Sequence, residues 1–416
     1  MTFIFFVNEV KAQVKNSTSK GKSDLTNNDS TKIVTKVIEN NDWKTIDVNF
    51  LNSYYQQDGN NSPVTGGIGT EQLTDFTQKI IVSAPLTKKT TLKVDGGYDY
   101  YSSASTDNID NIPSSDSASD VRVHGNVGLS IKKSKQHTFG FRIGGSTEYD
   151  YNSAQFGSNY SFLSKNKNTG ISVAAQAFLD QWSPIYPIEL RRTSEVPTSA
   201  RQSYSASLGL TQIVTKKMKI SLIAEAVSMN GLLSTPFHRV YFSDQESPKI
   251  ENLPNSRFKV PVALRMNYYI SNRFIARTYI RHYWDNWGVR GNTASIEIPF
   301  KINRFLAVYP HYRFHSQTAA EHFSEYKQHQ STSEFYTSDF DLSALTSQHY
   351  GIGLTYSPLQ GIAKFGRFNK DQKHMVTLKS LDLKYSHYQR STNFNADIIS
   401  FGLGFEINRG ANQVKT

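Results

Sequence analysis

Residues Ser256–Asn303 read SRFKVPVALRMNYYISNRFIARTYIRHYWDNWGVRGNTASIEIPFKIN, and this stretch decides the fold. From Phe258 to Ile270, every second residue is apolar or aromatic, and most of the residues between them are polar or small. A period of two places the two sets on opposite faces of a β-strand. The alternation resumes over residues 274–285 and again over residues 294–302, so the stretch predicts three consecutive strands.

The predicted strands are long, and their length bears on the kind of β-protein. A tilted strand that crosses a membrane needs about 9–11 residues, whereas strands of soluble proteins average about 5–6 residues. Alternation alone also fits a soluble all-β sandwich, which remains the alternative fold. The strand length, the aromatic residues near strand ends and the repetition of the pattern favour an all-β, closed antiparallel up-and-down transmembrane β-barrel.

The composition is compatible with such a barrel. The 416-residue chain has a mean hydropathy of −0.50, and it contains no run of about 18 apolar residues that could form a transmembrane helix. Barrel strands turn half of their residues away from lipid, so a low mean hydropathy is expected. The chain has no cysteine, which excludes disulfides, thiolate metal sites and a lipoprotein anchor.

The pattern divides the chain into four parts. Residues 1–13 (MTFIFFVNEVKAQ) are predicted to be the remnant of a secretory signal peptide, with a disordered N-terminus as the alternative. The absence of a basic n-region is compatible with a start upstream of Met1. Residues 14–44 are predicted to be a flexible lead, and residues 409–416 a tail. Residues 45–408 are predicted to form the barrel, with about 16 strands and 14 as the next alternative.

Short and long connections alternate along the barrel region, which gives an orientation. The short ones are polar and basic, with one longer exception at Ser357–Lys373: Pro85–Thr91, Lys132–His137, Ser164–Thr169, Val214–Lys219, Ile270–Arg273 and Lys301–Arg304. The long ones are Gln57–Thr70, Ser103–Asp120, Gln181–Arg201, Gly231–Asn255 and Ser316–Ser347. Outer-membrane barrels have short periplasmic turns and long outer loops, so the basic turns are expected to face the periplasm.

This distribution also accounts for the formal charge of +11. Much of the excess lysine lies in the short turns, where it can meet lipid head groups. The basic residues do not form a stripe with interleaved aromatic residues, so a nucleic-acid partner is not predicted. The expected partners are outer-membrane lipids and small solutes, with a protein or glycan bound by the outer loops as a candidate, and the expected location is the cell outer membrane.

Three segments resemble a known family. They are Ser53–Leu73 (SYYQQDGNNSPVTGGIGTEQL), Tyr98–Asp110 (YDYYSSASTDNID) and His282–Gly288 (HYWDNWG). In these the chain resembles an uncharacterised bacterial outer-membrane β-barrel family catalogued as a domain of unknown function (number three-five-seven-zero). The resemblance covers nearly the whole chain after residue 44. It implies an outer-membrane barrel and carries no activity that could be assigned to residues here.

Charged residues recur on the polar face of the predicted strands. A lysine or arginine on the lipid face at mid-membrane would cost about 2–4 kcal/mol, so these residues are expected to line the lumen. The set is Arg122, Arg142, Glu225, Arg265, Arg277, Arg281, Asp285, Glu297 and Arg313. They either pair across neighbouring strands and hold the lumen in shape, or they form a constriction that selects solutes.

No enzyme, cofactor or metal site is predicted. The best candidate cluster for chemistry is Arg281, Tyr283 and Asp285 with His311 and Arg313, but it matches no established catalytic motif. His311 and His315 share a strand face roughly 13 Å apart, too far to hold one metal ion. The function expected is therefore a channel or transport pore for small solutes. The alternatives are a non-conducting structural or surface-interaction barrel with a plugged lumen and, more remotely, an enzyme at the outer rim.

Overall fold

The structure is a computed structural model, and it describes residues 45–103, 119–190, 198–366 and 374–409. The predicted signal remnant, the lead and the tail after Arg409 lie outside the described residues. Most of the predicted loop Ser103–Asp120 lies outside them as well.

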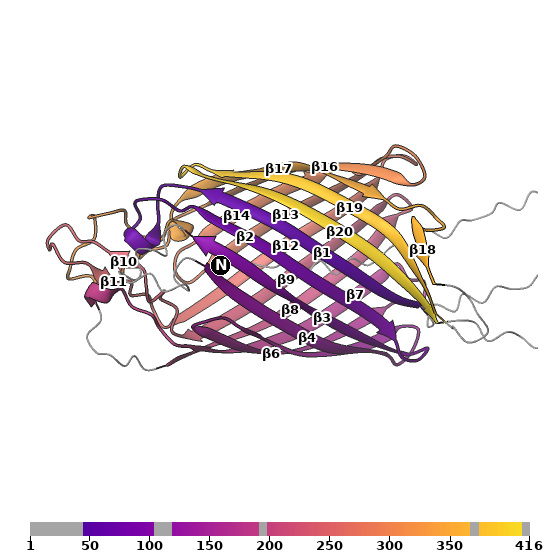
Figure 1. The fold of residues 1–416 in the computed structure, drawn as a ribbon, viewed down its shortest axis with the longest axis horizontal. Coiled ribbons are helices and arrows are strands. Elements are labelled where there is room, and N and C mark those ends of the chain that lie inside the picture. The colour runs from indigo at the N-terminus through magenta and orange to yellow at the C-terminus, as the bar shows by residue number, and fades with distance from the viewer. Residues whose placement is uncertain (1–44, 104–118, 191–197, 367–373, 410–416) are drawn as a thin grey trace, which may run out of the picture. The chain divides into compact units, whose positions relative to one another are not determined.

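Most of the described residues lie in strands, and most of these strands belong to one sheet (Figure 1). The strands of this sheet are β1 (Thr45–Asp58), β2 (Leu73–Pro85), β3 (Thr90–Ser103), β4 (Ser119–Lys132), β5 (His137–Thr147), β6 (Tyr151–Leu163), β7 (Thr169–Trp182), β8 (Ser199–Thr215), β9 (Met218–Gly231), β12 (Ser256–Tyr269), β13 (Ile275–Asp285), β14 (Arg290–Glu297), β15 (Phe300–Lys301), β16 (Leu306–Gln317), β17 (Leu345–Tyr356), β18 (Ala363–Phe365), β19 (His374–Arg390) and β20 (Phe394–Arg409). A separate hairpin consists of β10 (Arg239–Val240) and β11 (Lys249–Ile250).

Each strand of the large sheet pairs with its neighbour in an antiparallel ladder, and the sheet closes on itself. The closing ladder joins β1 to β20, from Thr45 opposite Asn408 to Asp58 opposite Asn395. Two barrel strands are interrupted, since β14 and β15 both pair with β16 and β17 and β18 both pair with β19. The result is a closed antiparallel barrel of 16 strands, which confirms the predicted fold and the larger of the two predicted strand numbers.

The interruption between β14 and β15 has a simple cause. The sequence predicts one continuous strand over residues 294–302, but Pro299 has no N–H to donate to the ladder. In the neighbouring β16, Pro310 also lacks an N–H, although its carbonyl oxygen still accepts from the Ile298 N–H at 3.1 Å. The ladder therefore breaks next to Pro299 and resumes at Phe300, opposite Val308.

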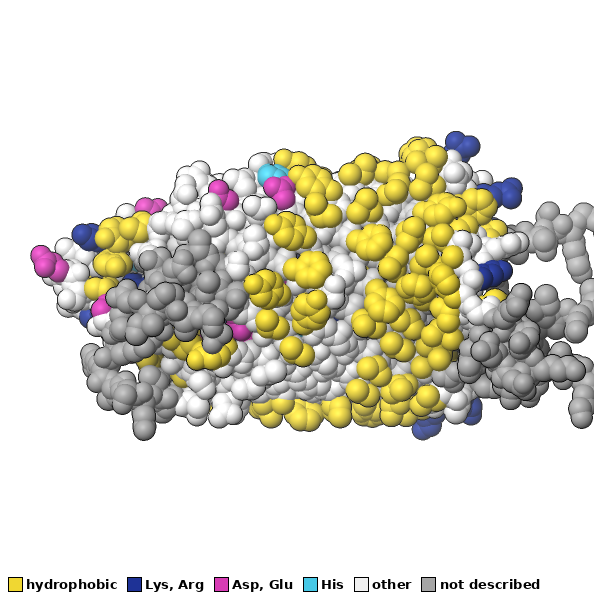
Figure 2. All heavy atoms as spheres, viewed as in Figure 1, with side chains coloured by type: hydrophobic (Ala, Val, Ile, Leu, Met, Phe, Trp, Pro, Cys, Tyr) yellow, Lys and Arg dark blue, Asp and Glu magenta, His cyan; other side chains and the backbone are white. Residues whose placement is uncertain are grey.

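Large apolar side chains cover the outside of the barrel (Figure 2). Ile280, Phe141 and Ile352 are each more than half exposed, with exposed fractions of 58%, 57% and 52%. Such exposure is unusual for a protein surrounded by water, and it is the outward face that lipid requires. Within the described residues, no helix reaches the length and hydropathy that crossing a membrane requires.

The two ends of the barrel differ. At one end, tight turns such as Lys216–Lys217 and Ser271–Arg273 carry exposed basic side chains, which gather at the right of Figure 2. At the other end lie long connections, together with β10, β11 and the short 3-10 helices η2 (Pro63–Thr65), η4 (Ile188–Leu190) and η5 (Phe340–Leu342). The predicted alternation of short and long connections is therefore present only in part, because residues 148–150, 286–289 and 391–393 are short connections at the same end as the long ones. We call the end that carries the long connections the outer end.

Candidate functional site

All nine charged residues singled out in the sequence lie on the face opposite to the exposed apolar side chains. Seven of them have an exposed outward neighbour, for example Arg313 beside Tyr312 and Phe314, which are 41% and 40% exposed. Glu225 and Arg277 have half-buried neighbours, and the period of two of their strands places them on this face. In a closed barrel this face is the inner one. The nine residues do not form one cluster, because they are distributed between two regions on opposite sides of the ring and at the outer rim.

The first region lies on β2–β5, and we call it the paired wall. Its centre is Asp95, which is only 5% exposed. The Asp95 carboxylate lies 3.0 Å from Lys79 Nζ and 2.7 Å from Arg142 Nη2, and it accepts a hydrogen bond from Asn126 Nδ2 at 3.1 Å. The sequence singles out Arg142 but not Lys79, and it could not identify the carboxylate that joins the two cations.

Glycine makes room for this ion cluster. A Cβ atom at Gly144, which lies opposite Asn126 in the β4–β5 ladder, would collide with the Asn126 side chain. Toward the outer end of the same wall, Arg122 Nε lies 3.3 Å from Glu148 Oε1. Each of Lys79, Arg122 and Arg142 thus lies beside a carboxylate, and two of them share Asp95.

The second region lies half-way round the ring, on β12, β13, β14 and β16. Here one ladder row places Arg265 opposite Tyr279, Tyr279 opposite Ser295, and Ser295 opposite Arg313. We call these four residues the arginine row. The Arg265 guanidinium lies 5.4 Å from the centre of the Tyr279 ring, a cation–π contact.

The arginine row has no carboxylate partner. Among the described residues, neither Arg265 nor Arg313 forms an ion pair, and neither does Lys384 on the nearby β19. The next residue in the row beyond Arg313 is His349, which offers no negative charge. Arg265 and Arg313 are therefore cations that no carboxylate of the described residues contacts within salt-bridge distance.

The other predicted charged residues near this region include an arginine that has a carboxylate partner. Arg277 Nη1 lies 2.7 Å from Glu297 Oε1, and both side chains are substantially exposed. The Arg281 guanidinium lies 5.5 Å from the Tyr283 ring centre. Glu225 projects from β9 on the inward face.

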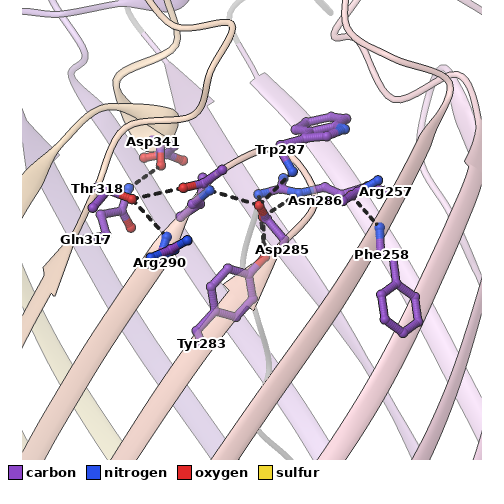
Figure 3. Close-up of polar contacts among 12 residues, drawn as sticks. Arg257, Phe258, Tyr283, Asp285, Asn286, Trp287, Arg290, Gln317, Thr318 and Asp341 are labelled. Carbon is purple, nitrogen blue, oxygen red and sulfur yellow. Dashed lines mark hydrogen bonds and ion pairs between the residues drawn. The ribbon is translucent and has the colours of Figure 1, made fainter.

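Asp285 ends β13 at the outer rim, where it is buried to 1% exposure (Figure 3). Its carboxylate accepts hydrogen bonds from Arg257 Nε at 2.9 Å and the Tyr283 hydroxyl at 2.7 Å. It also accepts from the backbone N–H groups of Trp287 and Val289, each at 3.0 Å. This saturated carboxylate fixes the β13–β14 turn and has no capacity left to act as a general base.

The predicted chemical cluster is thus only partly assembled. Arg281, Tyr283 and Asp285 are adjacent, but His311 lies elsewhere, with its ring centroid 5.0 Å from that of His349. His311 Nε2 lies 3.3 Å from the Ser386 hydroxyl. Nothing in this arrangement pairs an activated nucleophile with an oriented base.

Outer loops from distant parts of the ring meet over the barrel end, and we call this assembly the outer cap. It consists of residues 59–72, 183–190, 232–255 and 318–344. Arg239, in the β9–β12 loop, donates from Nη1 to the Val64 carbonyl oxygen at 2.7 Å and from Nε to Glu189 Oε1 at 2.6 Å. The β1–β2 and β9–β12 hairpins stand on opposite sides of the 16-strand ring, so these loops reach across the mouth.

The outer cap has small apolar cores of its own. One contains Val240, Phe242 and Tyr336, with the two rings packed edge to face at 5.0 Å. The other contains Leu253, Trp287, Val289 and Ala320, and Trp287 ties it to the Asp285 turn shown in Figure 3. The sequence predicts long loops here but not their packing, because contacts between distant loops leave no periodic signal.

Charged groups in the outer cap are strongly influenced by burial. Burial opposes the protonated form of His238, but the adjacent Glu251 carboxylate outweighs burial and raises the pKa of this imidazole. Burial raises the pKa of Asp339. For Asp341 burial acts in the same direction, but the Arg390 guanidinium, 2.5 Å from its carboxylate, lowers the pKa below its ordinary value.

Comparisons with known proteins give a family and several solved barrels. The sequence model of the family described as "Protein of unknown function (DUF3570)" matches residues 83–369, which include the segments Tyr98–Asp110 and His282–Gly288 but not Ser53–Leu73. Among curated proteins none matches the chain.

The similar solved structures are distant in sequence. Pseudomonas aeruginosa OccK1 (OpdK) is 8% identical over 87% of this chain and 98% of that chain, with a TM-score of 0.41. The siderophore receptor PirA from Acinetobacter baumannii is 10% identical over 82% of this chain and 53% of that chain, with a TM-score of 0.42. A bacterial polysaccharide outer membrane secretin is 10% identical over 87% of this chain and 98% of that chain, with a TM-score of 0.44.

Proposed function

The chain belongs to the DUF3570 family of proteins of unknown function, and from the geometry of its barrel we propose that it is a pore in the cell outer membrane that passes small solutes and favours anions. The observation that carries this proposal is the arginine row. Arg265 and Arg313 face inward without a carboxylate partner, so their charge is available to a passing solute.

In this proposal, the lumen-facing charged residues have two different roles. The paired wall holds the barrel in shape, because each of its cations already forms an ion pair with Asp95 or Glu148. The arginine row selects solutes, because a cation in a confined aqueous space raises the local concentration of anions. A small organic or inorganic anion is the class of solute that fits this distribution.

Conductance of the refolded protein in a planar bilayer tests the proposal. With a salt gradient of potassium chloride across the bilayer, the reversal potential should show that chloride passes more readily than potassium. The double variant R265Q/R313Q should shift the reversal potential toward potassium. The double variant K216Q/K217Q removes the same formal charge from an exposed turn and should leave the reversal potential unchanged.

Two results would contradict the anion pore. One is an inserted wild-type barrel that conducts equally for both ions, and the other is an equal shift of the reversal potential in both double variants. The second result would mean that the reversal potential depends on the total charge of the protein and not on the arginine row.

One observation favours a second function. Loops from opposite sides of the ring meet at Arg239 and Val64, which is the arrangement expected of a non-conducting barrel whose outer cap binds a surface partner. Conductance separates the two functions. Wild-type protein that inserts but stays silent, with channels appearing only in R239A, would support a closed cap over the pore and would place the recognition of solute or partner in the loops.

A further inference from the structure

Three acidic or imidazole side chains from two loops of the outer cap meet in a small space. They are His238, Glu251 and Asp339, and one ligand atom from each lies within 4.8 Å of the others. His238 and Glu251 are 9% and 5% exposed, and Asp339 is half-buried. We propose that these three residues form a binding site for a divalent transition-metal ion that joins the two loops.

The short β10–β11 hairpin positions two of the ligands. Arg239 pairs with Ile250 in this ladder, so the residues immediately outside it, His238 and Glu251, face each other. The Glu251 N–H donates to the His238 carbonyl oxygen at 3.0 Å. His238 Nδ1 and Glu251 Oε1 then lie 3.5 Å apart. Ligand atoms at about 2.0–2.1 Å from a tetrahedral zinc ion are separated by a similar distance, about 3.4 Å.

The third ligand comes from the β16–β17 loop. Backbone hydrogen bonds join Asn252 and Tyr336 in both directions, at 3.1 Å and 2.8 Å. They hold this loop against the end of the hairpin, and Asp339 follows three residues later at the start of η5. The site therefore depends on the contact between two loops that are about 90 residues apart in sequence, as the 86-residue separation of Glu251 and Thr337 illustrates.

The imidazole provides an observation that points to a ligand. His238 Nδ1 is buried and makes no hydrogen bond, although it lies beside a carboxylate oxygen at 3.5 Å. Buried polar atoms are nearly always hydrogen-bonded. A metal ion at this position would satisfy the nitrogen, and imidazole nitrogen with carboxylate oxygen is a donor set that zinc and related ions accept.

The charge balance points in the same direction. Of the carboxylates gathered here, Asp341 has the Arg390 guanidinium as partner. Among the described residues, His238 is the one basic group that forms an ion pair with Glu251, and Asp339 forms none. Two carboxylates with a single imidazole leave negative charge in a poorly solvated space, which a divalent cation would neutralise.

Hydrogen bonds already orient the carboxylates as outer partners do at metal sites. Glu251 Oε1 accepts from the Thr337 hydroxyl at 2.5 Å, and Oε2 accepts from the Thr235 N–H at 2.6 Å. Asp339 Oδ1 accepts from the Asp341 N–H at 2.9 Å. A glutamine or asparagine could retain these contacts through its amide oxygen, so conservative variants should preserve the loops while removing a charged ligand.

Zinc binding to protein purified without a polyhistidine tag tests the site. After equilibration with Zn²⁺ and gel filtration, the refolded wild-type barrel should retain one zinc ion per chain, measured by mass spectrometry of the metal. E251Q and D339N should each bind zinc at least about tenfold more weakly, while still migrating as heat-modifiable folded barrels on gels. H238N should lose binding in the same way.

Two histidine variants serve as controls. H322A removes a histidine of the same β16–β17 loop, whose ring contacts that of Phe335 at a tilted angle. H349A removes one of the two neighbouring inward histidines. Both should keep the wild-type zinc content. Absence of zinc from the folded wild-type protein, undiminished zinc in E251Q and D339N, or loss of zinc in H349A would each overturn the proposal.

Discussion

The paired wall and the arginine row lie on opposite sides of the barrel. They differ in whether their inward-facing cations have carboxylate partners. On β2–β5, Asp95 forms ion pairs with both Lys79 and Arg142. On β12–β16, Arg265 and Arg313 share a ladder row with Tyr279 and Ser295 and with no acid. An inward-facing charged residue can therefore either form an ion pair within the barrel wall or remain available to solutes in the lumen. The residues next to it in the ladder determine which of the two occurs.

The energetics of the two regions differ accordingly. Asp95 is almost fully buried, and a buried carboxylate without partners would carry a large desolvation penalty. Cations that remain partly in contact with water, such as Arg313, do not need a protein partner to remain charged. The paired wall should consequently govern stability, and the arginine row should govern selectivity.

The largest effect is expected from removing the centre of the paired wall. Asp95→Ala leaves Lys79 and Arg142 next to each other without their shared carboxylate. Losing one partner of a buried ion pair costs about 3–5 kcal/mol. Urea unfolding of the refolded barrel in lipid vesicles should show a fall of that size in the free energy of unfolding.

Asp99→Ala is the matched control for this variant. Asp99 lies on the same strand and face, and its carboxylate is 3.9 Å from Nδ1 of the His124 imidazole. Its replacement should lower the free energy of unfolding by less than about 1 kcal/mol. Equal losses for the two aspartates would show that the Asp95 cluster has no special role in holding the wall.

A pair of arginine variants compares the paired wall with the arginine row directly. Arg142→Gln removes a charge-assisted hydrogen bond to Asp95, which should cost about 1.5–3 kcal/mol. Arg313→Gln removes a cation without an ion-pair partner and should change the free energy of unfolding by no more than about 0.5 kcal/mol. The same urea titration measures both, and a larger loss for Arg313→Gln would contradict the division between the walls.

Adding an acid to the arginine row should make it resemble the paired wall. Ser295 lies directly opposite Arg313, so Ser295→Glu places a carboxylate beside that guanidinium. At about 6 Å in water, two unit charges interact by about 0.7 kcal/mol, which corresponds to about a threefold fall in the chloride-to-potassium permeability ratio. Reversal potentials measure this ratio.

Ser295→Gln provides the neutral control of similar size. It should leave the permeability ratio near the wild-type value. If Ser295→Gln lowers the ratio as much as Ser295→Glu, the change comes from narrowing the passage and not from charge.

The smallest effect is expected at the exposed pair of Arg277 and Glu297. The two side chains are 50% and 28% exposed, and exposed ion pairs contribute about 0.2–1 kcal/mol. A double-mutant cycle with Arg277→Ala and Glu297→Ala should give a coupling energy in that range. A coupling above about 2 kcal/mol would show that this part of the lumen is drier than its exposure indicates.

The barrel could be predicted from sequence because its rule is local. Alternation in Phe258, Val262 and Leu264 requires only neighbours two residues apart, and the different lengths of the connections predict the orientation. The same rule identified Arg265 and Arg313 as inward residues. It could not distinguish paired from unpaired cations, because Arg142 and Asp95 are 47 residues apart and meet only through the strand register.

The outer cap could not be predicted for a related reason. In its β16–β17 loop, residues 318–344, the structure has irregular turns, isolated bridges and one 3-10 turn at Phe340–Leu342. The grouping of His238, Glu251 and Asp339 depends on two loops packing together. No spacing in either loop signals it, whereas a search for histidines on one strand directs attention to His311 and His315.

The ladder between β1 and β20 has a consequence for biogenesis. This ladder pairs Thr45 with Asn408, so its hydrogen bonds join the first barrel strand to be synthesised to the last one. Until β20 exists, both β1 and the last completed strand present unpaired backbone groups, and each such group would cost several kcal/mol in hydrocarbon. A ribosome-bound or prematurely terminated chain therefore cannot form a stable partial barrel. Insertion should be an all-or-none event that follows completion of the chain, and the waiting polypeptide depends on protection from aggregation until then.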